Sequence, residues 1–189
     1  QAGSSTRGLI AGGSSNSAPA EVEKIQFVTF ASLGDAQDFG DRTVKSTSMS
    51  ALSNETRMVI GNGSILSVPH ANNTHDFVTI ASTGNANDFG DMVQKGHGPV
   101  GTASPTRGLI FGGYSNPDSS RINIIQFVTI STTGNTSDFG DMTQARSRGA
   151  GVSNSIRGVF LGGIVPGSPS TYTNRIDFVT IASTGNATD

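Results

Sequence analysis

The sequence predicts an all-β fold made of repeated small sheets, and three observations support this prediction. A Phe-Val-Thr segment begins at positions 27, 77, 127 and 178, in steps of 50, 50 and 51 residues. A glycine follows each copy at a fixed distance, at positions 34, 84, 134 and 185. The 189 residues contain 25 Gly and are only 14% charged, which is typical of short strands joined by tight turns. Self-similarity at this period indicates a repeat architecture.

Each repeat contains four strand candidates. The first is a run of small residues, as at 149–153, and the second is an arginine followed by apolar residues, as at 107–110. The third is the Phe-Val-Thr segment, and the fourth is centred on Asp-Phe-Gly-Asp at 38–41 and its copies. Runs this short and rich in β-branched and aromatic residues predict strands. Because the third strand is apolar on both faces, we expect it to lie between two neighbouring sheets.

The connections between strands follow the same period. Gly-Asn pairs such as 84–85 and 134–135 come after the third strand, and both residues tolerate the positive φ of tight hairpins. The segments between the second and third strands vary in length and hold most of the prolines: 14–23, 64–74, 114–123 and 164–174. We expect these four segments to be loops that project from one side of the molecule.

Four antiparallel strands in about 50 residues are typical of a β-propeller blade. We therefore predict one domain, 1–189, of about four blades, in which the last lacks its fourth strand. The repeats are expected at roughly 1–48, 49–98, 99–148 and 149–189. Stacking would bury the faces that one sheet alone leaves open. We expect the chain to be a segment of a longer protein or to close with another copy of itself, with association through open blade edges.

The glycine doublets Gly12-Gly13, Gly112-Gly113 and Gly162-Gly163 resemble those of the kelch repeat, and the resemblance covers essentially the whole chain. The chain departs from that pattern in the second copy, Gly61-Asn62-Gly63. It also has phenylalanine where kelch repeats have tyrosine and tryptophan. Segment 178–189, continued by the Phe-Gly-Asp of the other copies, is similar to repeats in virion structural proteins of marine cyanobacterial viruses.

These resemblances imply a non-enzymatic structural or adhesive module of a phage particle, in a tail, fibre or surface protein. The alternative is a cellular kelch-type scaffold for protein–protein interaction. The implied partners are other virion proteins or a host-surface glycan or protein. The implied location is the virion, outside the cell, with the cytoplasm as the alternative.

The variable segments hold the candidate binding residues. Both tyrosines of the chain lie there, close to amide and charged side chains. Aromatic rings beside such groups suit sugar faces and protein partners, and loop residues often carry function. The candidate partner-binding or glycan-binding residues are Tyr114, Asn116, Asp118, Arg121, Tyr172 and Asn174.

Several other functions are disfavoured. The chain has no cysteine for disulfides or thiolate metal sites, and its net charge of -2 gives no basic field for nucleic acid. No apolar run approaches the roughly 18 residues of a transmembrane helix. The Asp-Phe-Gly triplet lacks the other kinase motifs, and no Gly-x-Ser-x-Gly elbow is present. We expect no enzymatic activity, no cofactor, no metal and no membrane insertion.

The remaining polar residues have structural interpretations with a functional alternative. One arginine recurs at the same position in every repeat: Arg7, Arg57, Arg107 and Arg157. We expect these arginines to cap strands and pair with the aspartates of the Asp-Phe-Gly-Asp motif. An anion-binding arginine ring and a calcium site are the alternatives. The histidines, His70, His75 and His97, are expected to reflect sequence drift, because zinc requires three or four convergent ligands.

Overall fold

The computed structural model describes residues 2–15, 21–61, 63–65, 72–167, 169 and 171–189, and all regular elements in this part of the chain are strands. The all-β prediction is therefore confirmed. The strands are β1 (Ala2–Gly3), β2 (Arg7–Ala11), β3 (Lys24–Thr29), β4 (Gln37–Asp41), β5 (Ser50–Ser53), β6 (Arg57–Gly61), β7 (Asn72–Thr79), β8 (Asn87–His97), β9 (Val100–Ala103), β10 (Arg107–Phe111), β11 (Tyr114–Ser115), β12 (Ser120–Arg121), β13 (Ile124–Thr129), β14 (Ser137–Asp141), β15 (Ala150–Ser153), β16 (Arg157–Leu161), β17 (Ile164–Val165), β18 (Thr171–Tyr172) and β19 (Ile176–Thr180).

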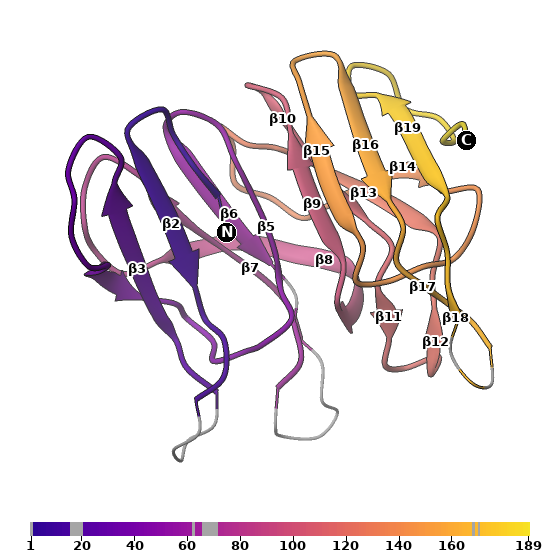
Figure 1. Cartoon of the computed structure of the whole chain (residues 1–189), viewed down its shortest axis with the longest axis horizontal. Helices are drawn as coiled ribbons and strands as arrows, with labels where there is room; N and C mark the ends of the chain where they lie inside the picture. The colour runs from indigo at the N-terminus through magenta and orange to yellow at the C-terminus, as the bar shows by residue number, and fades with distance from the viewer. Residues whose placement is uncertain (1, 16–20, 62, 66–71, 168, 170) are drawn as a thin grey trace.

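Each repeat folds into an antiparallel meander (Figure 1). The first and third repeats give the expected four-stranded sheets, β1–β4 and β9-β10-β13-β14. The second sheet has six strands, because the long strand β8 also pairs with the β11–β12 hairpin of the third repeat. The fourth repeat gives the three-stranded sheet β15-β16-β19 and a separate pair, β17-β18. The expectation of four strands in each repeat is thus incomplete, since two of the variable segments form strands of their own.

Consecutive sheets lie side by side, with their first strands adjacent: β5 contacts both β1 and β9, and β9 contacts β15 (Figure 1). We call the contact between two consecutive sheets a joint, and number the three joints in chain order. The face of a sheet toward the next repeat is its forward face, and the opposite face is its backward face. Every joint therefore pairs one forward face with one backward face.

The hydrophobic core is divided among the three joints. The first packs Leu9, Ile25, Phe27 and Phe39 against Met58, Ile60, Val78 and Ile80. The second packs Leu52, Val59, Phe89 and Met92 against Ile110, Val128 and Ile130. The third packs Leu109, Phe111, Ile125, Phe139 and Met142 against Phe160, Val179 and Ile181. Each of these side chains contributes about 1.5–3 kcal/mol when fully buried. The predicted position of the third strand between two sheets is confirmed for β7 and β13, whereas β3 and β19 each have a neighbouring sheet on one face only.

The most regular motif of the sequence joins one sheet to the next. In the first joint the Gly84 amide donates to the Phe39 carbonyl at 2.7 Å, and the Asp41 amide donates to Oδ1 of Asn85 at 3.0 Å. Gly40, at φ +151°, must be glycine because a Cβ there would lie 2.3 Å from the Gly84 carbonyl oxygen. The asparagine therefore has a different role from the predicted one. Among the described residues the turn glycine has a positive φ, whereas Asn85 does not and instead binds the preceding sheet.

Candidate functional site

The variable segment of the third repeat forms the β11–β12 hairpin, which follows directly from its polar residues. The Ser115 hydroxyl donates to Oδ2 of Asp118 at 2.6 Å, and the Asp118 amide donates back to Ser115 Oγ at 3.4 Å. Ser119 closes the turn with a positive φ of 49° and donates its amide to the Asn116 carbonyl at 3.3 Å. Short polar side chains of this type stabilise tight turns by bonding to their own backbone.

Tyr114 is the centre of a small polar and aromatic cluster at the base of this hairpin. Its ring lies 5.2 Å from the ring of His97, and the guanidinium of Arg121 lies 6.0 Å from its centroid. Asn116 Oδ1 and His97 Nδ1 are 3.0 Å apart, so an amide completes the cluster. Burial is the main reason why the pKa of half-buried His97 is lowered. The positive charges of Arg148 and Arg121 lower this pKa further, whereas the hydrogen bond with Asn116 raises it. The cluster can present a fixed aromatic ring with a neutral imidazole at pH 7.

Tyr172 and Asn174 belong to the corresponding segment of the fourth repeat. Tyr172 pairs with Ile164 across β17–β18, and its side chain is 79% exposed. Asn174 lines a surface hollow of about 380 Å³ beside Arg175 and Asp189, whose charged groups are 3.2 Å apart. Both hairpins project from the same side of the molecule (Figure 1). The structure thus brings Tyr114, Asn116, Asp118 and Arg121 together, and places Tyr172 and Asn174 on the neighbouring hairpin.

The prediction that these segments are loops is wrong for both hairpins. The equivalent segments of the first two repeats lie partly outside the described residues. His70 also lies outside them. We refer below to the side of the molecule that carries β11–β12 and β17–β18 as the hairpin rim.

The recurrent arginines Arg7, Arg57 and Arg107 bind backbone and not carboxylates. Nη1 of Arg7 donates to the carbonyls of Ile80 and Ala81 at 2.9 and 3.0 Å, across the first joint. The Arg7 guanidinium also lies 4.6 Å from the centroid of the Phe27 ring. Arg57 and Arg107 repeat both contacts at the next two joints. The expected arginine–aspartate pairing is therefore incorrect. These arginines instead connect one sheet to the next through hydrogen bonds to its backbone.

In the first repeat the two aspartates of the repeated motif pair with a lysine. Lys24 Nζ lies 2.9 Å from Oδ1 of Asp41 and 3.9 Å from Oδ1 of Asp38. Phe39, between these aspartates, is buried against the Phe27 ring, as expected for a residue that packs between sheets. Among the described residues no group of three or more His, Asp or Glu converges in a way that could hold a metal ion.

Two buried ion pairs were not predicted from the sequence. Arg42 Nε lies 3.0 Å from Oδ2 of Asp76 in the first joint, and Arg146 Nη2 lies 2.6 Å from Oδ2 of Asp177 in the third. All four side chains are fully buried. Asp76 also binds the Thr43 hydroxyl, and Asp177 accepts the Thr143 hydroxyl at 2.7 Å. The available signal was the residue before Phe-Val-Thr, which reads Gln26, Asp76, Gln126 and Asp177.

The second joint buries a neutral amide at the same position. Oε1 of Gln126 accepts the Val93 amide at 3.0 Å and the Thr136 hydroxyl at 2.7 Å. Its side chain is 1% exposed. Buried polar groups that keep their hydrogen bonds avoid most of the desolvation penalty. The buried Gln126 carbonyl oxygen has both of its donors, so this joint needs no charged pair at this position.

His75 is a core residue and not a ligand. It is 1% exposed, its ring lies 6.3 Å from the Phe89 ring, and it lies opposite Gly61 in the β6–β7 pairing. A Cβ on Gly61 would collide with the imidazole at 1.7 Å, so the glycine provides the space that the histidine fills. Burial, and secondly the charge of Arg42, lowers the pKa of His75 to about 4.

Comparison with known proteins gives no family assignment: no protein-family model matches this chain, and no curated protein is significantly similar to it. In the part of the chain that the structure describes, no helix is long and apolar enough to cross a membrane.

Proposed function

We propose that this chain is a non-enzymatic binding module in which kelch-like repeats, arranged as blades of a β-propeller, display the hairpin rim to a partner. The side-by-side order of the sheets, with their first strands adjacent, supports a radial arrangement of blades. The observation that carries the proposal is Tyr172, whose large aromatic side chain is 79% exposed on a hairpin at the rim. An exposed tyrosine in this setting is typical of binding surfaces.

The partner is best sought among glycans and protein loops. A tyrosine ring offers an apolar face to a sugar, and the Asn116, Asp118 and Arg121 side chains offer donors and acceptors around it. The contacts of Tyr114 with His97 and Arg121 fix its ring before any partner arrives. A side chain that is already ordered loses less conformational entropy on binding.

The similarity of segment 178–189 to virion structural repeats supports a place in a phage tail, fibre or surface protein. The partners in that setting are neighbouring virion proteins or a host-surface glycan. Antibodies raised against residues 1–189 are expected to label tails or fibres of purified particles in negatively stained micrographs. Labelling confined to the cytoplasm of cells would support the cellular scaffold in its place.

The binding surface is tested with a printed panel of bacterial lipopolysaccharides and capsular polysaccharides. The wild-type chain is expected to bind a subset of the panel, and Tyr172→Ala to lower the affinity by about tenfold or more. Leu33→Ala is the control, because Leu33 is fully exposed in the turn after β3, away from the rim. Equal binding by Tyr172→Ala and the wild type would remove the rim from the proposal.

A further inference from the structure

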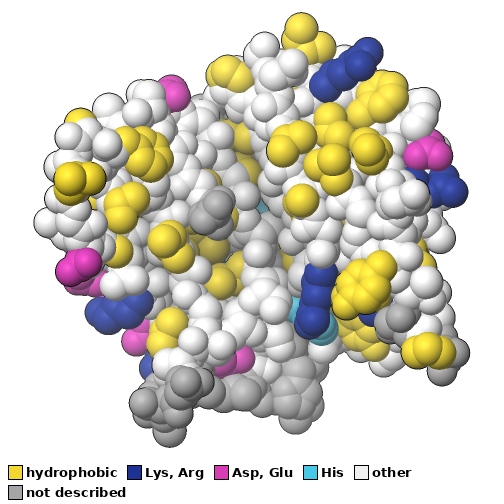
Figure 2. All heavy atoms as spheres, in the orientation of Figure 1, with side chains coloured by type: hydrophobic (Ala, Val, Ile, Leu, Met, Phe, Trp, Pro, Cys, Tyr) yellow, Lys and Arg dark blue, Asp and Glu magenta, His cyan; other side chains and the backbone are white. Residues whose placement is uncertain are grey.

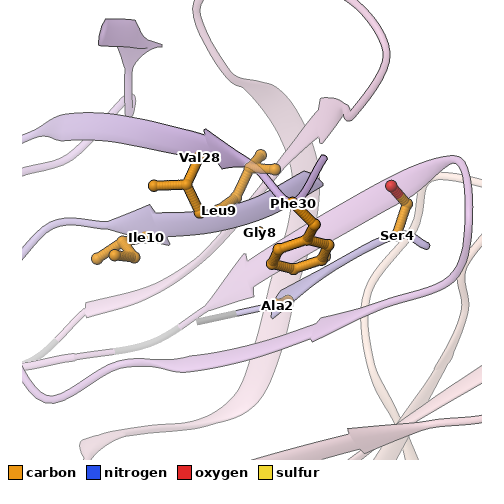
Figure 3. Close-up of a pocket in the computed structure, with 8 residues that line it drawn as sticks. Ala2, Ser4, Gly8, Leu9, Ile10, Val28 and Phe30 are labelled. Atoms are coloured by element: carbon orange, nitrogen blue, oxygen red, sulfur yellow. The ribbon is translucent and has the colours of Figure 1, made fainter. Parts of the chain in front are cut away.

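The backward face of the first sheet is open, although the same face is covered in every later repeat. Ile10 and Phe30 are 48% and 62% exposed, whereas their counterparts Ile60 and Ile80 are each 1% exposed. These residues, with Val28 and Gly8, line a hollow of about 430 Å³ (Figure 3). Figure 3 shows the Phe30 ring over Gly8, and a Cβ on Gly8 would lie 3.1 Å from that ring.

The forward face of the fourth sheet is open in the same way. Val152 is 57% exposed, whereas its counterpart Leu52 is 4% exposed in the second joint. Ile176 is 49% exposed, and its counterpart Ile125 is fully buried in the third joint. Figure 2 shows hydrophobic side chains gathered over this end of the molecule, above β15, β16 and β19. The two open faces are therefore one forward face and one backward face, the two halves of a joint.

We propose that a second copy of this chain covers the first sheet, with the forward face of its fourth sheet against the backward face of the first. The occupant is indicated by continuity with an established interface, because the same pair of faces meets three times inside the chain. The contact is heterologous, since two different faces meet, so it either closes a ring of copies or extends into a chain of them.

The polar residue before Phe-Val-Thr is compatible with this contact. A backward face with aspartate, as at Asp76 or Asp177, takes an arginine from the preceding repeat, whereas Gln126 takes neutral donors. The first sheet has the neutral Gln26 at this position, so a second copy can cover it without supplying an arginine.

Arg157 provides a specific anchor for this contact. Its counterparts Arg7, Arg57 and Arg107 each donate to carbonyl oxygens of the following repeat. Arg157 is exposed and already stacked on Phe178, at 4.7 Å from the ring centroid. Arg7 donates to the carbonyls of Ile80 and Ala81, and the equivalent positions in the first repeat are Phe30 and Ala31. We therefore expect Arg157 to donate to the carbonyls of Phe30 and Ala31 of the second copy. Packing of the two open faces and this arginine hold the contact.

Sedimentation velocity over a concentration series tests the proposal with one variant on each face. Phe30→Glu alters the backward face, and Ile176→Glu alters the forward face. Val93→Glu is the matched control, because Val93 is also 62% exposed and lies on neither open face. We expect the wild type and Val93→Glu to form oligomers, and each face variant to be monomeric with unchanged circular dichroism. Arg157→Gln is expected to weaken association roughly tenfold to a hundredfold, the effect of one charge-assisted hydrogen bond.

Mixing the two face variants distinguishes the two kinds of contact. Each keeps the face that the other has lost, so an equimolar mixture is expected to give dimers and nothing larger. If Ile176→Glu associates like the wild type, the contact is not heterologous and the proposal is wrong. If the wild type stays monomeric up to about 100 µM, where a micromolar Kd would fill the contact, a second copy is not the occupant. Phe30 lies away from the hairpin rim, whereas Ile176 lines the same hollow as Asn174. Glycan binding is therefore expected to persist in Phe30→Glu, which separates this contact from the proposed function.

Discussion

The first and second joints have the same frame and different buried polar groups. In both joints an arginine donates to carbonyl oxygens of the next repeat, and the turn glycine donates its amide to the preceding sheet. In both, the asparagine side chain accepts a backbone amide of the preceding sheet. The first joint adds the charged pair Arg42–Asp76, whereas the second has the neutral Gln126 in its place. The comparison shows that the recurrent residues position the sheets and that the variable buried residue determines which neighbour fits.

Breaking the ion pair of the first joint gives the largest expected effect. Asp76→Asn leaves the buried Arg42 guanidinium without a carboxylate, and burial already lowers the pKa of Arg42. Loss of one partner of a buried pair costs about 3–5 kcal/mol. Chemical denaturation followed by circular dichroism is expected to show a loss of this size in the free energy of unfolding.

The matched control converts the first joint into a copy of the second. The triple variant Arg42→Met, Asp76→Gln and Ala86→Thr introduces the residues found at Met92, Gln126 and Thr136. It is expected to recover most of the stability, because a buried pair and a satisfied neutral group are often equivalent. A triple variant as unstable as Asp76→Asn would show that the joints are not interchangeable.

The pH dependence of stability is expected to come partly from His75, which faces the second joint. Its pKa is about 4 when folded and about 6.5 when unfolded, so between these values the unfolded chain binds a proton that the folded chain excludes. The contribution of His75 to the free energy of unfolding is therefore fully present above about pH 6.5. It is lost as the pH falls toward 4, by on the order of 3 kcal/mol. His75→Ile, the residue of the other repeats, should flatten this part of the profile. An unchanged slope in that variant would assign the pH dependence to other groups.

Removing the neutral acceptor of the second joint is expected to have a smaller effect than breaking the charged pair. Gln126→Ala leaves the Val93 amide and the Thr136 hydroxyl without their buried acceptor. The expected loss is about 1–3 kcal/mol, measured by the same denaturation experiment. A loss as large as that of Asp76→Asn would contradict the distinction drawn between the joints.

The smallest effect concerns a contact that both joints share. Asn85→Ala and Asn135→Ala each remove one acceptor from an exposed backbone amide, at 3.0 and 2.9 Å. Each is expected to cost about 1 kcal/mol, and the two values should agree within about 0.5 kcal/mol. Hydrogen exchange of the β4 and β8 amides would locate each loss. Clearly unequal losses would mean that the shared frame is not equivalent at the two joints.

The sequence predicted the features that recur and missed those that differ between repeats. The strands around Arg107 and Phe127 were predictable because their apolar pattern has a period that only a buried strand explains. The pairing of Asp76 and Asp177 was not, because their arginines come from non-equivalent positions, 42 in one repeat and 146 in another. A spacing rule cannot find partners that lie at different offsets.

The binding residues were predicted in part. Tyr114 and Tyr172 were recognised as loop residues with polar neighbours, and both lie on the hairpin rim. Their hairpins were not recognised, because two-residue strands have no detectable periodicity. The contribution of His97 to the Tyr114 cluster was missed as well, since it comes from the preceding repeat through β8.

The length of β8 has a consequence for how such a chain can be built by duplication. Its last residues, Gly96 and His97, pair with Ser115 and Tyr114, so a hairpin encoded in one repeat completes the sheet of the repeat before it. The equivalent residues form the same contact at the other two joints, as antiparallel bridges between Thr47 and Ser64 and between Ser147 and Ile164. A single repeat can therefore be copied or exchanged without this loss only if its variable segment still pairs with the end of the repeat before it.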